Sequence, residues 1–186
     1  MQGWVNCFSQ NLVPNPSFEE YFSCPDAEDQ LDRCKYWFNS LDGSPDYFHQ
    51  CAKKGFGGKR ILFGVPYNVD GYQNARTGIA YAGIINFDNE YFTYREFLTT
   101  RLLKPLTAGK IYLVSMYVSL SDSSRYFNNR FGFCLSKEKK LPSEHKIKEY
   151  NVYTCGNGIT VYNDTIKSDT TSWHLIQTEY QAKGGE

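Results

Sequence analysis

The sequence is poor in the residues and motifs on which most enzymes depend. Its three histidines, His49, His145 and His174, stand in no His-Glu-x-x-His motif, and no Gly-x-Ser-x-Gly motif occurs. No Cys-x-x-Cys pair is present, and the cysteine spacing matches neither a zinc knuckle nor a zinc ribbon. These absences argue against a zinc protease, an α/β-hydrolase and a structural zinc site.

The chain also lacks an excess of charge and a long apolar segment. Its 20 Lys and Arg residues balance 20 Asp and Glu residues, so the sequence predicts no positive field for nucleic acid. No segment approaches the roughly 20 consecutive apolar residues that a transmembrane helix needs. We therefore expect neither a nucleic-acid partner nor direct insertion into a membrane.

What the chain has in abundance is aromatic residues and cysteine. It contains 15 Tyr and 13 Phe, and aromatic residues make up 17% of its 186 residues, a composition typical of β-sheets and of sugar-binding surfaces. Six cysteines are many for a cytosolic domain of this size, so the sequence favours an oxidising compartment. The length suits a single domain.

Three segments pair a turn element with an apolar or alternating run, a pattern typical of antiparallel strands. They are NLVPNPSFEE at 11–20, TGIAYAGI at 77–84 and LKPLTAGKIYLVSMYVS at 103–119. In the third segment, 107–110 is predicted to form a turn and 111–121 a strand. Strand alternation places side chains on two faces. We expect one face to point between two sheets and the other to face outward. The inward face carries Tyr112, Val114, Met116, Val118 and Leu120, and the outward face carries Leu113, Ser115, Tyr117, Ser119 and Ser121.

Further strands are predicted after Pro16 and over 79–85, 128–136 and 173–180. The segments 150–154 and 159–162 flank a Gly-rich turn and are expected to pair as a hairpin. Residues 137–149 carry eight charges of mixed sign and are interpreted as a solvated loop. Helix signals are almost absent from the sequence.

Together the three segments resemble the jelly-roll carbohydrate-binding modules of the galactose-binding-like superfamily. They are most similar to N-terminal modules of secreted and surface proteins of Gram-negative bacteria, which often precede an OmpA-like or a sorting domain. The resemblance implies an all-β, two-sheet antiparallel jelly-roll β-sandwich with long irregular loops over residues 10–186. It also implies a secreted, periplasmic or cell-surface location in bacteria, and binding without catalysis.

The resemblance also bears on the two ends of the chain. Residues 1–9 resemble the tail of a secretory signal peptide, but the charged start and the long apolar centre are missing, so an N-terminal extension is the alternative. Modules of this type usually continue past a turn like that at 184–186 with further strands. We therefore expect a module that is truncated at its C-terminus, or a sandwich that closes differently.

Two structural expectations come from the same resemblance. A cysteine pair matching Cys24 and Cys51 is common in the family, which implies a disulfide between them. Cys34 then pairs with Cys155 or Cys134, or stays free. The family often ties its first and last strands with calcium through a carboxylate placed like that of Glu19, and carboxylate oxygen suits this ion.

The outward face of the 111–121 strand is the predicted ligand site. Sugar recognition needs rings for stacking and polar groups that bond hydroxyls in fixed directions. The predicted ligand-binding residues lie on this strand, in the loop that follows it and in the long connection that could wall the site: Ser115, Tyr117, Ser119, Arg125, Tyr72, Gln73 and Arg76. The predicted partner is a glycan or a cell-wall polysaccharide.

Two other functions fit the same sequence. One is a structural or assembly domain of an envelope or secretion complex, which would bind protein instead of sugar. The other is a small glycoside hydrolase, which needs two carboxylates held about 5–9.5 Å apart in a cleft. The acidic residues available for such a pair are Glu19, Glu20, Asp46, Asp70, Glu96 and Asp122.

Overall fold

The computed structural model describes residues 10–40, 43–54, 61–86, 94–137, 143–147, 150–154, 158–164 and 169–186. Within these ranges the chain is all-β, with one short 3₁₀ helix, η1 (Leu31–Arg33), and no α-helix. None of the described residues forms a helix that is long and apolar enough to span a membrane. The strands are β1 (Trp37–Phe38), β2 (Asp46–His49), β3 (Tyr67–Asn68), β4 (Gly71–Tyr72), β5 (Ala80–Gly83), β6 (Thr99–Thr100), β7 (Ile111–Val118), β8 (Arg130–Cys134), β9 (Ser143–Ile147), β10 (Tyr150–Thr154), β11 (Gly158–Tyr162) and β12 (His174–Gln181).

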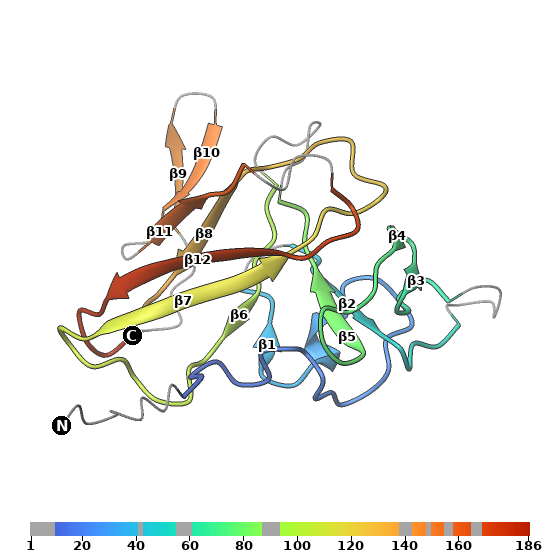
Figure 1. Ribbon diagram of the computed structural model, residues 1–186, viewed down its shortest axis with the longest axis horizontal. Coiled ribbons are helices and arrows are strands. Elements are labelled where there is room, and N and C mark those ends of the chain that lie inside the picture. The colour runs from blue at the N-terminus through green and yellow to red at the C-terminus, as the bar shows by residue number, and fades with distance from the viewer. Residues whose placement is uncertain are drawn as a thin grey trace, which may run out of the picture.

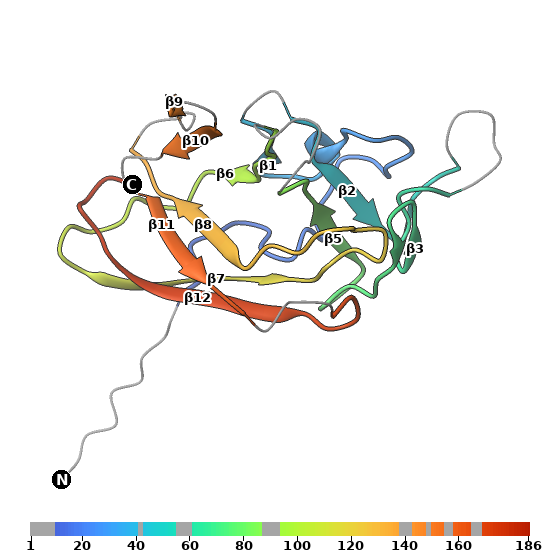
Figure 2. The ribbon, with the colours of Figure 1, turned by 90° about the horizontal axis from the view of Figure 1, so that it is seen from above.

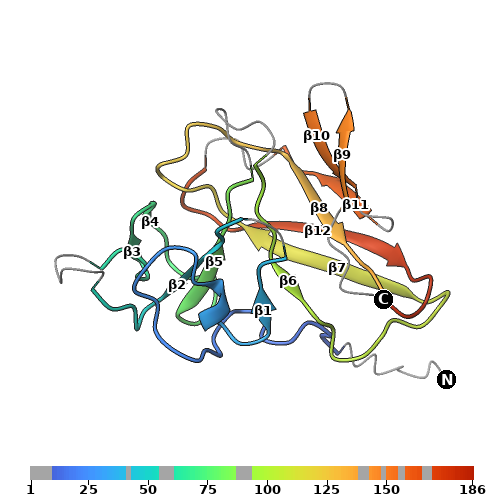
Figure 3. The same cartoon turned by 180° about the vertical axis from the view of Figure 1, so that it is seen from behind.

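These strands form six antiparallel pairs, β1–β6, β2–β5, β3–β4, β7–β12, β8–β11 and β9–β10. Seen from above, β7 and β12 lie along one side of the molecule, and β1, β6, β2 and β5 lie along the opposite side (Figure 2). Figures 1 and 3 show the β3–β4 hairpin at one end and the β9–β10 hairpin toward the other. The all-β prediction is confirmed, and the two layers are consistent with a β-sandwich. The jelly-roll connectivity stays a prediction.

The longest pair, β7–β12, follows directly from the sequence pattern. The predicted 107–110 turn is confirmed, because the Lys110 N–H bonds the Thr107 carbonyl at 3.2 Å and Gly109 adopts a φ of 77°. Side chains along β7 then alternate between exposed and half-buried, starting with an exposed Ile111. In β12 the residues on the inner face include the buried Ile176 and Tyr180. One face of this pair therefore points into the molecule and the other outward, as predicted.

The prediction of a strand after Pro16 is wrong. Asn15 and Phe18 have φ values of 43° and 65°, which interrupt an extended backbone, and the Phe18 N–H bonds the Asn15 carbonyl at 3.1 Å. The segment is a compact turn, after which Tyr21 forms a single isolated bridge to Cys34. The Asn15 side chain stabilises this turn, because it bonds the Glu20 N–H and the Glu20 and Lys35 carbonyls.

Two predictions for the C-terminal half are also wrong. Residues 137–149 were predicted as a loop, but β9 occupies Ser143–Ile147 and pairs with β10. Consequently β10 is not the partner of β11, which instead pairs with β8 from Gly158↔Cys134 to Tyr162↔Arg130. Charge content misled the prediction because backbone pairing between neighbouring segments does not require an apolar face. The strands predicted over 79–85, 128–136 and 173–180 are confirmed with shifted ends.

Among the described residues, buried side chains form a cluster in each layer. Cys34, Tyr47 and Ala80 make the first cluster, against which Phe18 and Trp37 pack. The second cluster lies on the inner face of β7–β12 and consists of Leu106, Tyr180 and Ala182, with partly buried Leu12, Leu102, Tyr112, Val114, Leu135 and Ile159 around it. Separate clusters leave a cleft between the layers.

Candidate functional site

The outer face of β7 presents a ring at the place that the sequence predicts. Tyr117 is 38% exposed and lies opposite Leu175 of β12 in the antiparallel register. Ser115 is exposed two residues earlier on the same face, and Ser119 follows just after the strand ends. The sheet thus holds Tyr117 and its two flanking hydroxyls in one row.

The connection between β4 and β5 brings Arg76 onto this ring. The Arg76 guanidinium carbon lies 3.4 Å from the centroid of the Tyr117 ring, which is a close cation–π contact. A guanidinium stacked in this way keeps its N–H donors near the edge of the ring. The pair therefore combines an aromatic surface with directional hydrogen-bond donors.

Gln73 joins the same group of residues through its side chain. Its Oε1 accepts the Ser119 hydroxyl at 2.9 Å, and its Nε2 donates to the Thr171 carbonyl at 3.5 Å. The Gln73 backbone N–H donates to the Pro66 carbonyl at 2.9 Å, so the residue is fixed at both ends. We call Ser115, Tyr117, Ser119, Gln73 and Arg76 the Tyr117 surface.

Two predicted ligand-binding residues stand at the border of this surface. The Tyr72 backbone N–H donates to the Asp122 carboxylate at 2.8 Å, and this bond is the main cause that lowers the pKa of Asp122. Tyr72 is 45% exposed. Arg125 is exposed in the segment between β7 and β8. Arg76 and Gln73 thus contact Tyr117 and Ser119 directly, whereas Tyr72 and Arg125 lie beside them.

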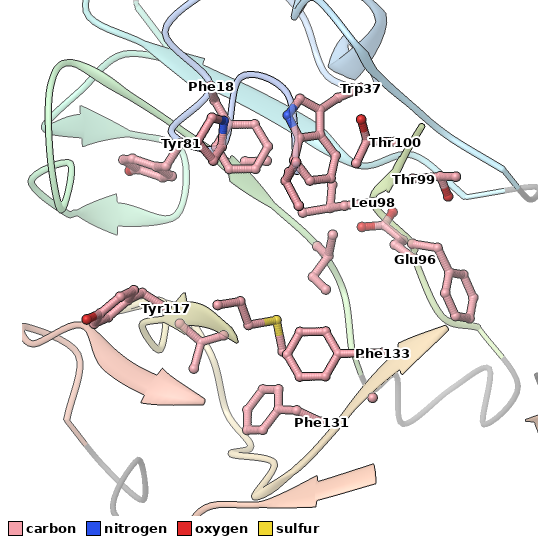
Figure 4. A pocket seen from close by; sticks show the side chains of 18 of the residues that line it. Phe18, Trp37, Tyr81, Glu96, Leu98, Thr99, Thr100, Tyr117, Phe131 and Phe133 are labelled. Carbon is pink, nitrogen blue, oxygen red and sulfur yellow. The ribbon is translucent and has the colours of Figure 1, made fainter. Parts of the chain in front are cut away.

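A cleft of 2670 Å³ lies between the two layers. In Figure 4, Phe18, Trp37 and Leu98 lie on one wall, and Phe131 and Phe133 lie on the other. All seven predicted ligand-binding residues line this cleft, but it runs along most of both layers, so shared lining does not define a site. The lining mixes aromatic and aliphatic side chains with polar ones such as Glu96, Thr99 and Thr100, and the Tyr117 surface is the part where a ring, a guanidinium, an amide and two hydroxyls lie together.

The acidic residues in the cleft have structural partners. Glu96 is only 5% exposed, and its carboxylate accepts hydrogen bonds from Ser44 N at 2.9 Å, Ser44 Oγ at 3.0 Å, the Tyr94 hydroxyl at 2.7 Å and Ile85 N at 2.6 Å. Burial raises the pKa of Asp46 to about 6, the Asp29 N–H opposes that rise, and the charge of Glu96 adds to it. A carboxylate held by four donors is poorly suited to act as a nucleophile or proton donor.

Glu19 connects the Asn15 turn to β5. Its two carboxylate oxygens accept the Ile79 N–H at 3.1 and 3.2 Å. Gly78 has a φ of 66°, and a Cβ there would collide with this carboxylate. No group of three or more His, Cys, Asp or Glu side chains able to hold a metal ion is found among the described residues. Calcium sites also use backbone carbonyls and water, so calcium at Glu19 stays a prediction.

The predicted disulfide between Cys24 and Cys51 is confirmed, with a Cα–Cα distance of 5.5 Å. Of the three alternatives for Cys34, the structure shows the free thiol, which is buried. Cys134 is disulfide-bonded. Cys7 and Cys155 lie outside the described residues. A disulfide is consistent with a location outside the cytoplasm.

Sequence reasoning gave no binding role to Trp173, and it did not predict that Tyr67 and Tyr72 pair. The Trp173 indole N–H donates to the Asn74 carbonyl at 2.9 Å, and its ring lies 5.7 Å from that of Tyr81. Tyr67 packs edge-on against Tyr72 at 4.8 Å. The sequence signal for Tyr67 and Tyr72 was their place on either side of a short turn, where paired strands put side chains opposite each other.

No known protein family, no curated protein and no solved structure matches this chain.

Proposed function

We propose that this protein is a non-catalytic binding module that recognises a glycan, such as a cell-wall polysaccharide, through the Tyr117 surface. The proposal rests on the Tyr117 ring with Arg76 stacked 3.4 Å from its centroid and with the Ser119–Gln73 hydrogen bond beside it. A ring packs against the C–H face of a sugar, and guanidinium, amide and hydroxyl groups bond its hydroxyls. These groups are fixed by a regular strand and by backbone contacts, so little order must be gained on binding.

The proposed setting is a secreted, periplasmic or surface-attached bacterial protein. The Cys24–Cys51 disulfide supports this setting, because such bonds persist in oxidising compartments. The jelly-roll resemblance of the sequence supports the glycan, since this class of fold presents one sheet face to its ligand.

Binding of protein is the second candidate function. Ile111 and Leu113 lie on the same outer face of β7 and are each 65% exposed. Exposed apolar side chains in a row favour a protein interface over a sugar site. In this case the row of Ile111 and Leu113, and not the Tyr117–Arg76 pair, would dominate binding.

Affinity-gel retardation tests the proposal. The wild-type protein is run through gels containing peptidoglycan fragments, β-1,3-glucan, xylan, mannan or glycol chitin, and it should be retarded by at least one polymer. Tyr117→Ala should weaken that binding about tenfold, since a ring contact contributes about 1–1.5 kcal/mol. Tyr117→Phe should retain most of it.

Tyr162→Ala is the matched control, because Tyr162 is 66% exposed but lies on β11 outside the Tyr117 surface. It should bind like the wild type. Equal retardation of Tyr117→Ala and Tyr162→Ala would refute the Tyr117 surface as the glycan site. If no polymer retards the wild type, glycan binding fails and the protein interface becomes the better candidate.

A further inference from the structure

The β3–β4 hairpin carries a second pair of exposed rings. Tyr67 and Tyr72 are direct cross-strand partners, with ring centroids 4.8 Å apart and planes at 74°. Tyr67 is 71% exposed and Tyr72 is 45% exposed. Single exposed rings such as Tyr162 need no ligand to explain them, but two exposed rings in contact at a fixed angle form a larger aromatic surface that a ligand can use.

The hairpin is anchored from inside by Asn68. This side chain is only 8% exposed, and its Nδ2 donates to the Tyr81 hydroxyl at 2.6 Å. Its Oδ1 accepts the Asp70 N–H at 2.9 Å, which closes the two-residue turn between the strands. The turn that carries the two exposed rings is therefore fixed by hydrogen bonds of the buried Asn68 side chain.

The segment after β7 holds the hairpin from the other side. Asp122 accepts the Tyr72 N–H at 2.8 Å, and the Ser121 hydroxyl donates to the Asp70 carbonyl at 3.0 Å. Gly71 has a φ of 124°, and its missing side chain leaves the space that the Asp122 carboxylate occupies. The hairpin and the end of β7 thus form one rigid unit.

This unit continues into the Tyr117 surface without a break in the chain. Gln73 follows Tyr72 and bonds Ser119, and Asn74 Nδ2 donates to the Tyr72 hydroxyl at 3.4 Å. Along the chain the Tyr67–Tyr72 rings come first, then Gln73 and Asn74, and then Arg76, which stacks on Tyr117. Rings alternate with amide and guanidinium groups along this path.

We propose that the Tyr67–Tyr72 pair is a second sugar-binding position, so that the ligand is a chain of several sugars and not a single terminal sugar. The inference rests on the proposed glycan-binding function. Asn74 bonds the Tyr72 hydroxyl and Asp122 accepts the Tyr72 backbone N–H, so polar groups lie beside the pair, which suits a hydroxyl-rich ligand better than an apolar peptide. A polymer that spans both positions gains contacts that a short fragment cannot make.

Isothermal titration with oligosaccharides of different length tests this inference. The probes are a disaccharide and a hexasaccharide of the polymer that retards the wild type. Wild-type protein should bind the hexasaccharide at least tenfold more tightly than the disaccharide. Tyr67→Ala should remove most of that difference while leaving the disaccharide affinity within about twofold, and Tyr117→Ala should weaken both probes.

Two further variants control for structure. Tyr67→Phe keeps the ring and should keep the hexasaccharide affinity within about twofold, and Tyr162→Ala should behave like the wild type in both titrations. An unchanged length dependence in Tyr67→Ala, with its melting temperature unchanged, overturns the second position but leaves the glycan-binding function intact. Failure of the wild type to bind any of the polymers overturns both.

Discussion

The two layers of this protein are held together in different ways. Around β2 and β5 the strands are short, and side chains such as those of Asn15 and Glu96 supply many of the hydrogen bonds. In the β7–β12 pair the backbone ladder extends over eight residues of each strand, and burial alternates along it. The first layer depends on a few particular polar residues, whereas the second depends on a repeating pattern. Substitutions should therefore act locally and strongly in the first layer and according to face in the second.

The largest effect is expected at the centre of the β12 inner face. Ile176 is 1% exposed, so Ile176→Ala should lower the free energy of unfolding by about 3–4 kcal/mol through lost contacts and a cavity. The neighbouring Leu175→Ala, at a side chain that is 39% exposed, should cost less than about 1 kcal/mol. Urea denaturation of both variants measures the difference. Equal losses would show that the two faces of β12 do not differ as described.

Asn15→Ala tests the polar layer and should cost about 2–3 kcal/mol. The Asn15 side chain donates to the Glu20 and Lys35 carbonyls at 2.8 and 3.0 Å and accepts the Glu20 N–H at 3.0 Å. Alanine leaves these groups unpaired and fits the positive φ less well. Asn11→Ala is the control, because Asn11 is exposed and accepts a local bond from the Val13 N–H, and it should change stability by less than about 0.5 kcal/mol. A loss no greater than that of the control would contradict the role given to Asn15.

A pH-dependent effect of intermediate size is expected at Asp46. Its folded pKa is raised to about 6 from an ordinary value of 3.8, so the folded state holds the proton more tightly than the unfolded state. Stability should therefore fall as the pH rises from about 4 to about 6. Asp46→Asn removes this dependence and should stabilise the protein by about 1–2 kcal/mol at pH 7, with no gain near pH 4. A gain that is the same at both pH values would show that the titration of Asp46 is not its source.

The smallest effect is expected from calcium, if it binds at Glu19. Chelation with EDTA should then lower the melting temperature by about 2–4 °C, which corresponds to roughly 1 kcal/mol for a chain of this size. Added calcium should restore the midpoint, and Glu19→Gln should abolish the response. If EDTA does not change the melting temperature of the wild type, calcium binding at Glu19 is refuted, and the bond to the Ile79 N–H is the role that remains for this carboxylate.

The same contrast explains how much of the fold could be predicted from the sequence. Strand β7 was predicted together with its turn and its two faces, because the alternation of its side chains is visible in consecutive residues of the sequence. The Asn15 turn was mistaken for a strand. The Asn15 side chain bonds the Glu20 and Lys35 carbonyls, and no sequence pattern indicates that these groups come together in the folded chain. The β9–β10 hairpin was missed for a related reason, since pairing partners are not encoded in composition.

The candidate site was predictable to a similar extent. The place of Tyr117 followed from strand alternation, but its contact with Arg76 joins residues 41 positions apart and depends on how one connection crosses the end of a sheet. The Tyr67–Tyr72 pair is local in sequence, and a two-residue turn could have suggested it. Its link to Asp122 could not be predicted, because no local pattern relates the two segments.

The buried thiol of Cys34 has a practical consequence. It is 1% exposed, lies 3.3 Å from the Asn15 amide nitrogen, and has a pKa that burial raises to about 12. A thiol in this state does not react with maleimides or iodoacetamide until the turn above it lifts away. The rate of alkylation at Cys34 therefore measures how often the N-terminal layer opens locally, and no cysteine has to be introduced for the measurement.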